Sequence, residues 1–145
     1  ITMSEKIEIE KFFVEELKII QDIIKRMALN SFLIKGWAIT LVVATLLLKG
    51  NKYQVLIAFI PLLVFWFLDA YFLWQEKMYR ELYKWVVENR LKTDEYLFNM
   101  NAYRFKDKVQ SKFRIMFSIT LGWFYCSIAI LVIIYALILL TIPGG

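Results

Sequence analysis

The chain has 145 residues and a formal net charge of +5, and 60% of its residues are hydrophobic and 17% aromatic. This apolar content exceeds that of an ordinary soluble domain, so we expect an integral membrane protein. The sequence contains no histidine and a single cysteine. It therefore cannot form histidine-dependent catalytic triads, zinc sites that use histidine, or disulfides within the chain.

Residues 4–30 are predicted to form an amphipathic helix with Ser4 as its N-cap. Hydrophobic side chains recur at alternating spacings of four and three residues, at Phe13, Leu17, Ile20, Ile24 and Met27. This stripe can pack on another helix of the same chain or form a coiled coil between subunits, and its short length leaves both alternatives open. The acidic start of the chain lacks the pattern of a cleavable signal peptide.

No helix breaker separates this segment from residues 31–48, an apolar run near the length of about 20 residues that a bilayer-spanning helix needs. The only charged residue in this run is Lys35. A polar turn at 49–52 leads into a second apolar segment at 53–74, in which Pro61 predicts a kink. The two apolar segments are therefore expected to form a helical hairpin of two membrane spans.

The second span continues without glycine or proline into residues 75–92. Hydrophobic residues recur there at helical spacing, at Met78, Leu82, Trp85 and Val86. The apolar faces of 4–30 and 75–92 are expected to bury each other. Residues 93–114 are predicted to be a connector that becomes basic, and residues 115–142 a third span. We expect a single all-α membrane domain in which three long helices include a hairpin that extends into the cytoplasm.

The distribution of Lys and Arg predicts the orientation in the membrane. The 49–52 turn holds two of these residues, whereas 1–30 and 75–114 together hold fifteen. By the positive-inside rule, the N-terminus and the 75–114 region face the cytoplasm, and the hairpin tip and C-terminus face outside. We expect a multi-pass protein of the inner (plasma) membrane with a cytoplasmic N-terminus.

Asp69 lies inside the second span, in FWFLDAYFLWQEK at 65–77, where a charge costs about 2.5–3.5 kcal/mol at the bilayer centre. Counted from the turn, the depths of Lys35 and Asp69 differ by about three residues, or roughly 4.5 Å, which a lysine side chain can bridge. We therefore expect an intramembrane charge pair between Lys35 and Asp69. It either holds the hairpin together, with a hydrogen bond from a nearby Tyr or Trp, or lines a polar path or subunit seam.

Small residues recur every fourth position in two spans. They are Gly36, Thr40 and Ala44 in the first span, and Ser118, Gly122 and Cys126 in the third. Faces of this kind let membrane helices approach closely, so we expect helix contacts there. Spacing alone does not distinguish contacts within one chain from contacts between subunits.

Five basic residues precede or begin the third apolar run: Arg104, Lys106, Lys108, Lys112 and Arg114. Beside a membrane span, the expected partner of such residues is anionic lipid, worth up to about 1 kcal/mol per residue. Phe105 and Phe113 have rings that can stack on bases. No recognised nucleic-acid module is present, so nucleic acid is not an expected partner.

The sequence lacks a phosphate-binding loop, a paired-carboxylate cleft and a cluster of residues with metal-ligand spacing. We therefore expect no catalytic, cofactor or metal site. The chain is not expected to be an enzyme.

The segments RMALNSFLIKGWAITLV (26–43) and FWFLDAYFLWQEKMYRELY (65–83) resemble small bacterial membrane proteins found beside antiviral systems, including CRISPR and cyclic-nucleotide-signalling modules. In plan, the chain resembles the accessory membrane protein of RNA-targeting type VI CRISPR systems, which assembles into a pore. That family has been linked to an Arg–His ribonuclease-like motif, which a chain without histidine cannot carry. The resemblance implies an oligomeric membrane effector that compromises the envelope when triggered.

Two hypotheses about function follow. In the first, the chain forms a homo-oligomeric pore or channel-like assembly, whose seams are set by the charge pair and the small-residue faces. The scarcity of polar residues to line a channel argues against it. In the second, the chain is a non-conducting membrane anchor or scaffold that recruits a cytoplasmic protein through residues 1–30 and 75–114.

Overall fold

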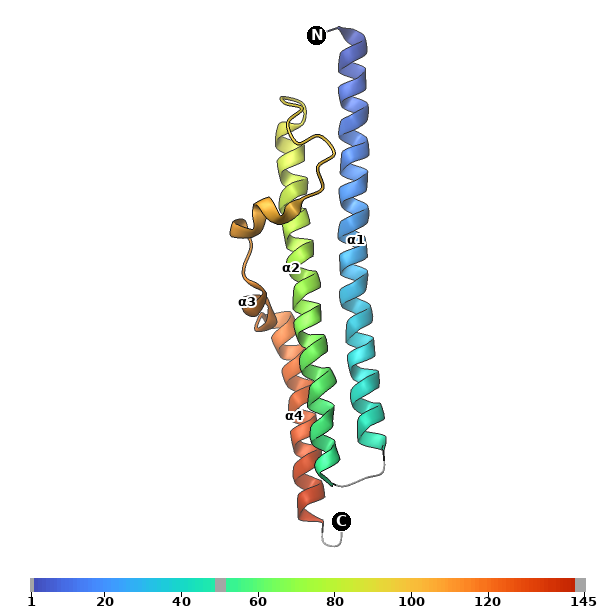
Figure 1. The fold of residues 1–145 in the computed structure, drawn as a ribbon, viewed down its shortest axis with the longest axis vertical. Helices are drawn as coiled ribbons and strands as arrows, with labels where there is room; N and C mark the ends of the chain where they lie inside the picture. Colours follow the sequence, from blue (N-terminus) through green and yellow to red (C-terminus); the bar gives the residue numbers. More distant parts are fainter. Residues whose placement is uncertain (1, 49–51, 143–145) are drawn as a thin grey trace. The chain divides into compact units, whose positions relative to one another are not determined.

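The computed structural model describes residues 2–48 and 52–142, and every regular element in these ranges is a helix (Figure 1). The elements are α1 (Met3–Leu47), the 3₁₀ helix η1 (Lys52–Ala58), α2 (Phe59–Asn89), the 3₁₀ helix η2 (Ala102–Lys108), α3 (Lys112–Met116) and α4 (Ile119–Thr141). Three segments, Met3–Leu47, Tyr53–Asn89 and Ile119–Thr141, are long and apolar enough to cross a membrane. The predicted all-α fold with three candidate spans is therefore confirmed.

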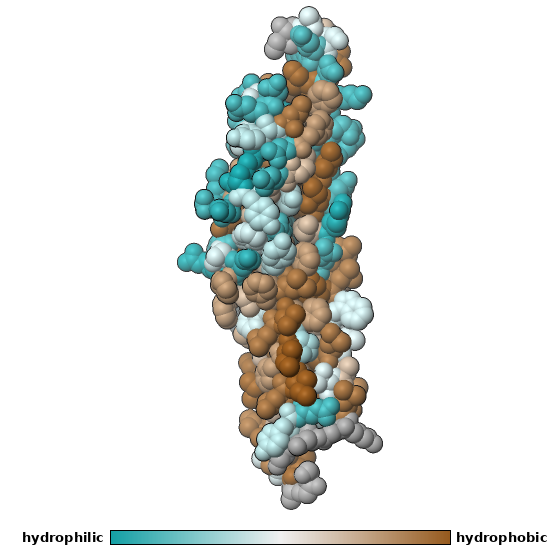
Figure 2. All heavy atoms as spheres, in the orientation of Figure 1, coloured by the Kyte–Doolittle hydropathy of each residue, from teal (hydrophilic) through white to brown (hydrophobic). Residues whose placement is uncertain are grey.

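Contacts group the described chain into two compact units, and the single domain stays a prediction. The arm unit contains Ile1–Leu29 and Leu73–Gln110, and the span unit contains Asn30–Phe72 and Ser111–Gly145. Figure 2 shows hydrophobic side chains over the visible face of the span unit, and mostly hydrophilic ones over that of the arm unit. The surface of each unit thus fits a different solvent, lipid for one and water for the other.

Helix α1 begins with a reciprocal capping arrangement at Thr2. The Oγ1 atom of Thr2 accepts a hydrogen bond from the backbone N–H of Glu5 at 3.2 Å, and the Glu5 carboxylate accepts one from the N–H of Thr2 at 2.8 Å. This is a capping box, which satisfies N–H groups that the first turn of a helix leaves unpaired. The cap is therefore Thr2 and not Ser4, which lies inside the helix.

The second apolar segment starts as a 3₁₀ helix and becomes α-helical at Phe59. Pro61 lies in the first turn of α2, where its missing N–H removes no bond that an α-helix would make. The helix type changes two residues before Pro61, and the kink there stays a prediction. The turn predicted at 49–52 lies outside the described residues except for Lys52, which begins η1.

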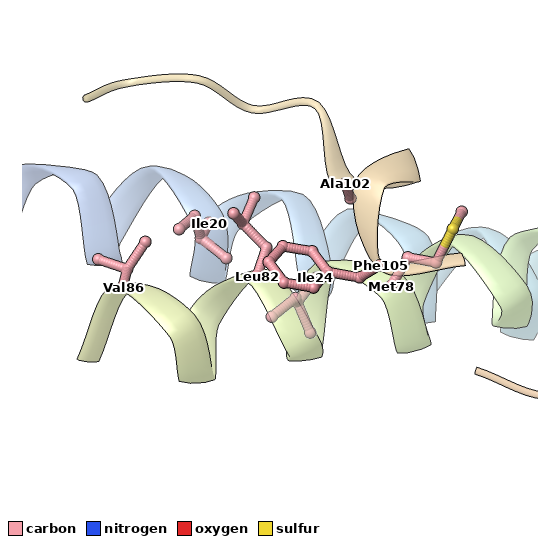
Figure 3. Packing of buried hydrophobic residues seen from close by; sticks show 7 residues of the cluster. All are labelled: Ile20, Ile24, Met78, Leu82, Val86, Ala102 and Phe105. Carbon is pink, nitrogen blue, oxygen red and sulfur yellow. The ribbon is translucent and has the colours of Figure 1, made fainter. Parts of the chain in front are cut away.

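The core of the arm unit joins α1, α2 and η2. Its buried members are Ile20, Ile24, Met78, Leu82, Val86, Ala102 and Phe105 (Figure 3). Phe13 and Leu17 pack against this cluster from α1, and Trp85 from α2. The hydrophobic stripe of the N-terminal helix therefore packs within its own chain, which was the first of the two alternatives. Residues of η2, expected to be part of a connector, complete this core.

The third apolar run is divided in two. Helix α3 ends at Met116, and α4 begins at Ile119 with Ser118 as its N-cap. The N–H of Gly122 donates to the Ser118 carbonyl at 2.7 Å and so closes the first turn of α4. We expected one continuous segment over 115–142, because hydropathy does not change at Phe117–Ser118. Ser118 has the extended backbone of an N-cap residue, but its side chain makes no capping hydrogen bond to α4.

Candidate functional site

The main polar centre of the span unit surrounds Asp69, a residue of α2 whose side chain is fully buried. Its carboxylate accepts hydrogen bonds from the ammonium of Lys35 at 2.6 Å and the hydroxyl of Tyr125 at 2.9 Å. The hydroxyl of Ser31 donates a third and short hydrogen bond to it. The structure thus brings the predicted pair of Lys35 and Asp69 together and adds two partners.

Three helices contribute to this network. Ser31 and Lys35 lie one turn apart on α1, so both side chains are on the same face, and the Lys35 ammonium also donates to the Ser31 hydroxyl at 2.9 Å. Asp69 lies on α2 and Tyr125 on α4. The carboxylate therefore links α2 to both of the other candidate spans, and we call these four residues the Asp69 network.

Aromatic packing positions Tyr125 beside Asp69. Its ring stacks on that of Trp66, with centroids 5.8 Å apart and an interplanar angle of 9°. Trp66 precedes Asp69 by one turn of α2, and its indole N–H donates to the Met116 carbonyl at 2.8 Å. The ring of Phe117 meets Trp66 edge-on at 5.4 Å. These contacts fix α2 against the start of α4, so that the Tyr125 hydroxyl reaches the carboxylate.

The burial of Asp69 limits what the network can do chemically. A buried carboxylate is tolerated only when its charge is paired and its oxygens are hydrogen-bonded. Three donors supply this at Asp69, and the Lys35 side chain, which is 26% exposed, supplies the opposite charge. In one chain the carboxylate is therefore closed to solvent and to ligands, and the arrangement is suited to joining helices.

The small-residue face of α1 is open, whereas the face at Ser118, Gly122 and Cys126 is partly covered by its own chain, since a Cβ added at Gly122 would lie 3.4 Å from the Phe117 backbone. Gly36, Thr40 and Ala44 are exposed on α1, and a Cβ added at Gly36 would meet no atom within 4 Å. Around the other face, Ser118 and Gly122 are half-buried and Cys126 is exposed. These three line a hollow of about 410 Å³ along α4. The expected helix contacts at these faces stay a prediction, which now concerns a second chain.

The five basic residues proposed to contact lipid have different surroundings. Lys106, Lys108 and Arg114 are exposed, whereas Lys112 is half-buried, with its ammonium about 5.9 Å from the ring centre of Phe67. The guanidinium of Arg104 lies among three aromatic rings of the arm unit. Its Cζ atom is 4.6 Å from the ring centre of Trp85, 4.1 Å from that of Tyr96 and 4.8 Å from that of Phe105. Burial lowers the pKa of Arg104 below its usual value. Their contact with lipid stays a prediction.

Sequence reasoning missed a second buried ion pair, which lies in the arm unit. The guanidinium of Arg90 donates to the two carboxylate oxygens of Glu16 at 2.7 and 3.0 Å. It also donates to the backbone carbonyls of Thr93 and Glu95, each at 2.8 Å. The Glu16 carboxylate in turn accepts the N–H of Phe98 at 3.1 Å. This pair ties the segment after α2 to α1.

The partners that were not identified from the sequence differ in how far the sequence pattern could have predicted them. Ser31 lies one helical turn before Lys35 and could have been assigned to the same face. A Tyr or Trp partner was expected for Asp69, but choosing Tyr125 requires the register of α4 against α2. Glu16 and Arg90 are 74 residues apart, and no local pattern relates them.

No group of three or more His, Cys, Asp or Glu side chains that could hold a metal ion occurs in residues 2–48 and 52–142. Comparison with protein-family models, curated proteins and solved structures finds no match to this chain.

Proposed function

We propose that the chain is a non-conducting anchor of the plasma membrane whose arm unit docks a cytoplasmic protein, and that it acts without catalysing a reaction. The observation that carries this proposal is the closure of the Asp69 network within one chain. Asp69 is fully buried and accepts three hydrogen bonds from its own chain. A pore would instead need such a group exposed along a water-filled path.

The surface of the span unit supports the same proposal. Most exposed positions of α4 are apolar and include Ile119, Trp123, Ile130, Leu131, Ile133, Ile134, Leu137, Ile138 and Leu140. On α1, the exposed large residues of this unit include Phe32, Leu33, Trp37, Ile39, Leu41 and Val43. Surfaces of this composition fit lipid tails, whereas a conducting path needs polar groups to replace the hydration of an ion.

The arm unit offers what a docking module needs. Its own core joins α1, α2 and η2, and its outer faces carry charged side chains that are free to meet a partner. The fifteen Lys and Arg of residues 1–30 and 75–114 support a cytoplasmic location for this unit and for the N-terminus. A folded, charged unit attached to three candidate spans can hold a soluble protein at the membrane surface.

Electrical recording tests the proposal. The full chain, reconstituted into planar bilayers, should give no current steps above those of a protein-free bilayer, with a channel-forming peptide as the positive control. Current steps that require the full chain would overturn the proposal. They would be most decisive if Asp69→Asn changed their size or ion preference.

A second function is favoured by the small-residue face of α1, which is exposed and where a Cβ added at Gly36 would meet no atom within 4 Å, and by the partly exposed face of α4. In it, several copies associate through these faces into a pore that perturbs the membrane. The resemblance to membrane proteins of antiviral systems supports this alternative and suggests antiviral defence as its role.

Self-association through the α1 face can be tested at Gly36. A larger side chain there meets open space within the chain, so Gly36→Leu should fold normally. If copies pack through this face, the variant should lose cross-linked oligomers in a native membrane. Leu41→Phe, which adds bulk at an exposed position off the stripe, is the matched control. Equal cross-linking in wild type and both variants would exclude this face as an interface.

A further inference from the structure

The arm unit contains a basic hollow that the proposed function does not use. Its volume is about 700 Å³, and α1, α2 and the segment after η2 all contribute to its walls. Pockets of about 300–1,000 Å³ are typical of sites for small molecules. Four cations line it, namely Lys77, Arg80, Lys84 and Lys108.

The basic lining has a simple origin in the sequence. Lys77, Arg80 and Lys84 are spaced by three and four residues, so they form one stripe along α2. Lys108, the last residue of η2, reaches the same hollow from another part of the chain. Gln21 lines it from α1 and adds an uncharged hydrogen-bonding group. Cations from two elements thus converge on one space.

Only half of this positive charge is neutralised by the chain. Arg80 donates to the Glu76 carboxylate through Nε at 3.1 Å and Nη2 at 2.7 Å, and the Lys84 ammonium pairs with Glu81 at 3.0 Å. Among residues 2–48 and 52–142, neither Lys77 nor Lys108 forms an ion pair. The hollow therefore retains a positive charge that attracts an anion.

We propose that this hollow binds a phosphate-bearing anion, with Lys77 and Lys108 as the principal contacts. A phosphate group carries several acceptor oxygens, which allows cations from two sides to bind it at once. Gln21 and the Tyr83 hydroxyl, which also line the hollow, supply donors for the remaining oxygens. The proposal is independent of whether the chain conducts ions.

Two sources could supply this phosphate, an anionic lipid headgroup or a soluble phosphate ester. Along the chain, Lys77 lies three residues after Trp74, where the apolar part of its helix ends. Lys108 lies four residues before the first residue of α3. Lys77 therefore lies just past the predicted second span at 53–74, and Lys108 just before the third apolar run at 115–142, and bilayer headgroups are found at the ends of spans. The experiment therefore includes one probe of each source.

Native mass spectrometry of the full chain in detergent can count bound phosphatidylglycerol, with phosphatidylcholine as the neutral lipid. A parallel titration uses glycerol 3-phosphate as the soluble probe. We expect saturable binding of one phosphatidylglycerol per chain, weakened about tenfold or more in Lys77→Gln/Lys108→Gln, since two charge-assisted contacts are lost. Binding of glycerol 3-phosphate with the same sensitivity would assign the site to the phosphate group itself.

The control variant is Lys11→Gln/Lys92→Gln, which removes the same charge from exposed positions of the arm unit outside the hollow. It should change binding by no more than about twofold, because a single bound lipid responds weakly to distant exposed charge. Equal losses in the two double variants would show diffuse surface attraction and overturn the proposal. Binding that no variant changes, or no preference over phosphatidylcholine, would overturn it as well.

Discussion

At Asp69, three hydrogen-bond donors from two other helices converge on one carboxylate, and each donor has a separate effect. Lys35 supplies the balancing charge, Ser31 occupies the second oxygen, and Tyr125 links the carboxylate to α4. Removing the carboxylate therefore affects more of the span unit than removing any single donor. Because the network is closed inside one chain, we expect its loss to appear in stability before it appears in subunit number.

Substitutions at the two ends of one hydrogen bond measure this difference. Asp69→Asn removes the charge that balances Lys35 and replaces one acceptor oxygen by an N–H donor. It should lower the free energy of unfolding by about 3 kcal/mol, as breaking a buried ion pair does. Tyr125→Phe keeps the ring on Trp66 and removes only the hydroxyl, so it should cost about 0.6–2 kcal/mol.

Unfolding of the full chain in mixed detergent micelles, followed by circular dichroism, gives both values. The test is the difference between the two variants in the free energy of unfolding, since both substitutions keep the shape of the side chain. If Asp69→Asn cost no more than Tyr125→Phe, the carboxylate would not be the joint that we describe.

At the scale of elements, the buried pair of Glu16 and Arg90 holds the segment after α2 in an unusual conformation. Tyr96 and Phe98 in that segment have φ angles of 57° and 53°, a left-handed region that costs a non-glycine residue roughly 1 kcal/mol or more. The bonds from Arg90 to two carbonyls and from the Phe98 N–H to Glu16 offset this cost. The pair therefore organises backbone as well as charge.

Arg90→Met tests this role. The variant keeps much of the side-chain volume but leaves Glu16 buried without a partner, which should destabilise the arm unit by about 3–5 kcal/mol. Hydrogen exchange should also become faster at the Phe98 amide, because its acceptor is no longer fixed. Lys92→Met, at an exposed position two residues later, should change stability by less than about 0.5 kcal/mol. Unchanged exchange at Phe98 in Arg90→Met would contradict this account.

The long elements could be predicted from the sequence because few residues interrupt them and their hydrophobic residues recur at helical spacing. Ile20, Met78 and Leu82 were expected on facing stripes and are buried together. The break at Phe117–Ser118 was not predicted, since both of its flanks are apolar. Likewise, Tyr125 and Arg90 could not be assigned to their partners, because such contacts depend on how distant helices are rotated and shifted against one another.

At the scale of the whole molecule, the chain combines two units with different surfaces. The arm unit has a core of its own and a charged exterior, and the span unit buries the Asp69 carboxylate and exposes mainly apolar side chains. This division supports an anchor better than a channel, because the buried carboxylate of the spans is already used to join the helices. A pore would require several copies to create a polar path that one chain does not offer.

The most direct test of this account is the mass of the particle formed by the full chain in lipid nanodiscs, measured by native mass spectrometry for wild type and Asp69→Asn. If the Asp69 network is a joint within one chain, both proteins should show the same small number of chains, while only their stability differs. A closed ring of many copies in the wild type that dissociates in Asp69→Asn would contradict it. That result would place Asp69 at a seam between subunits.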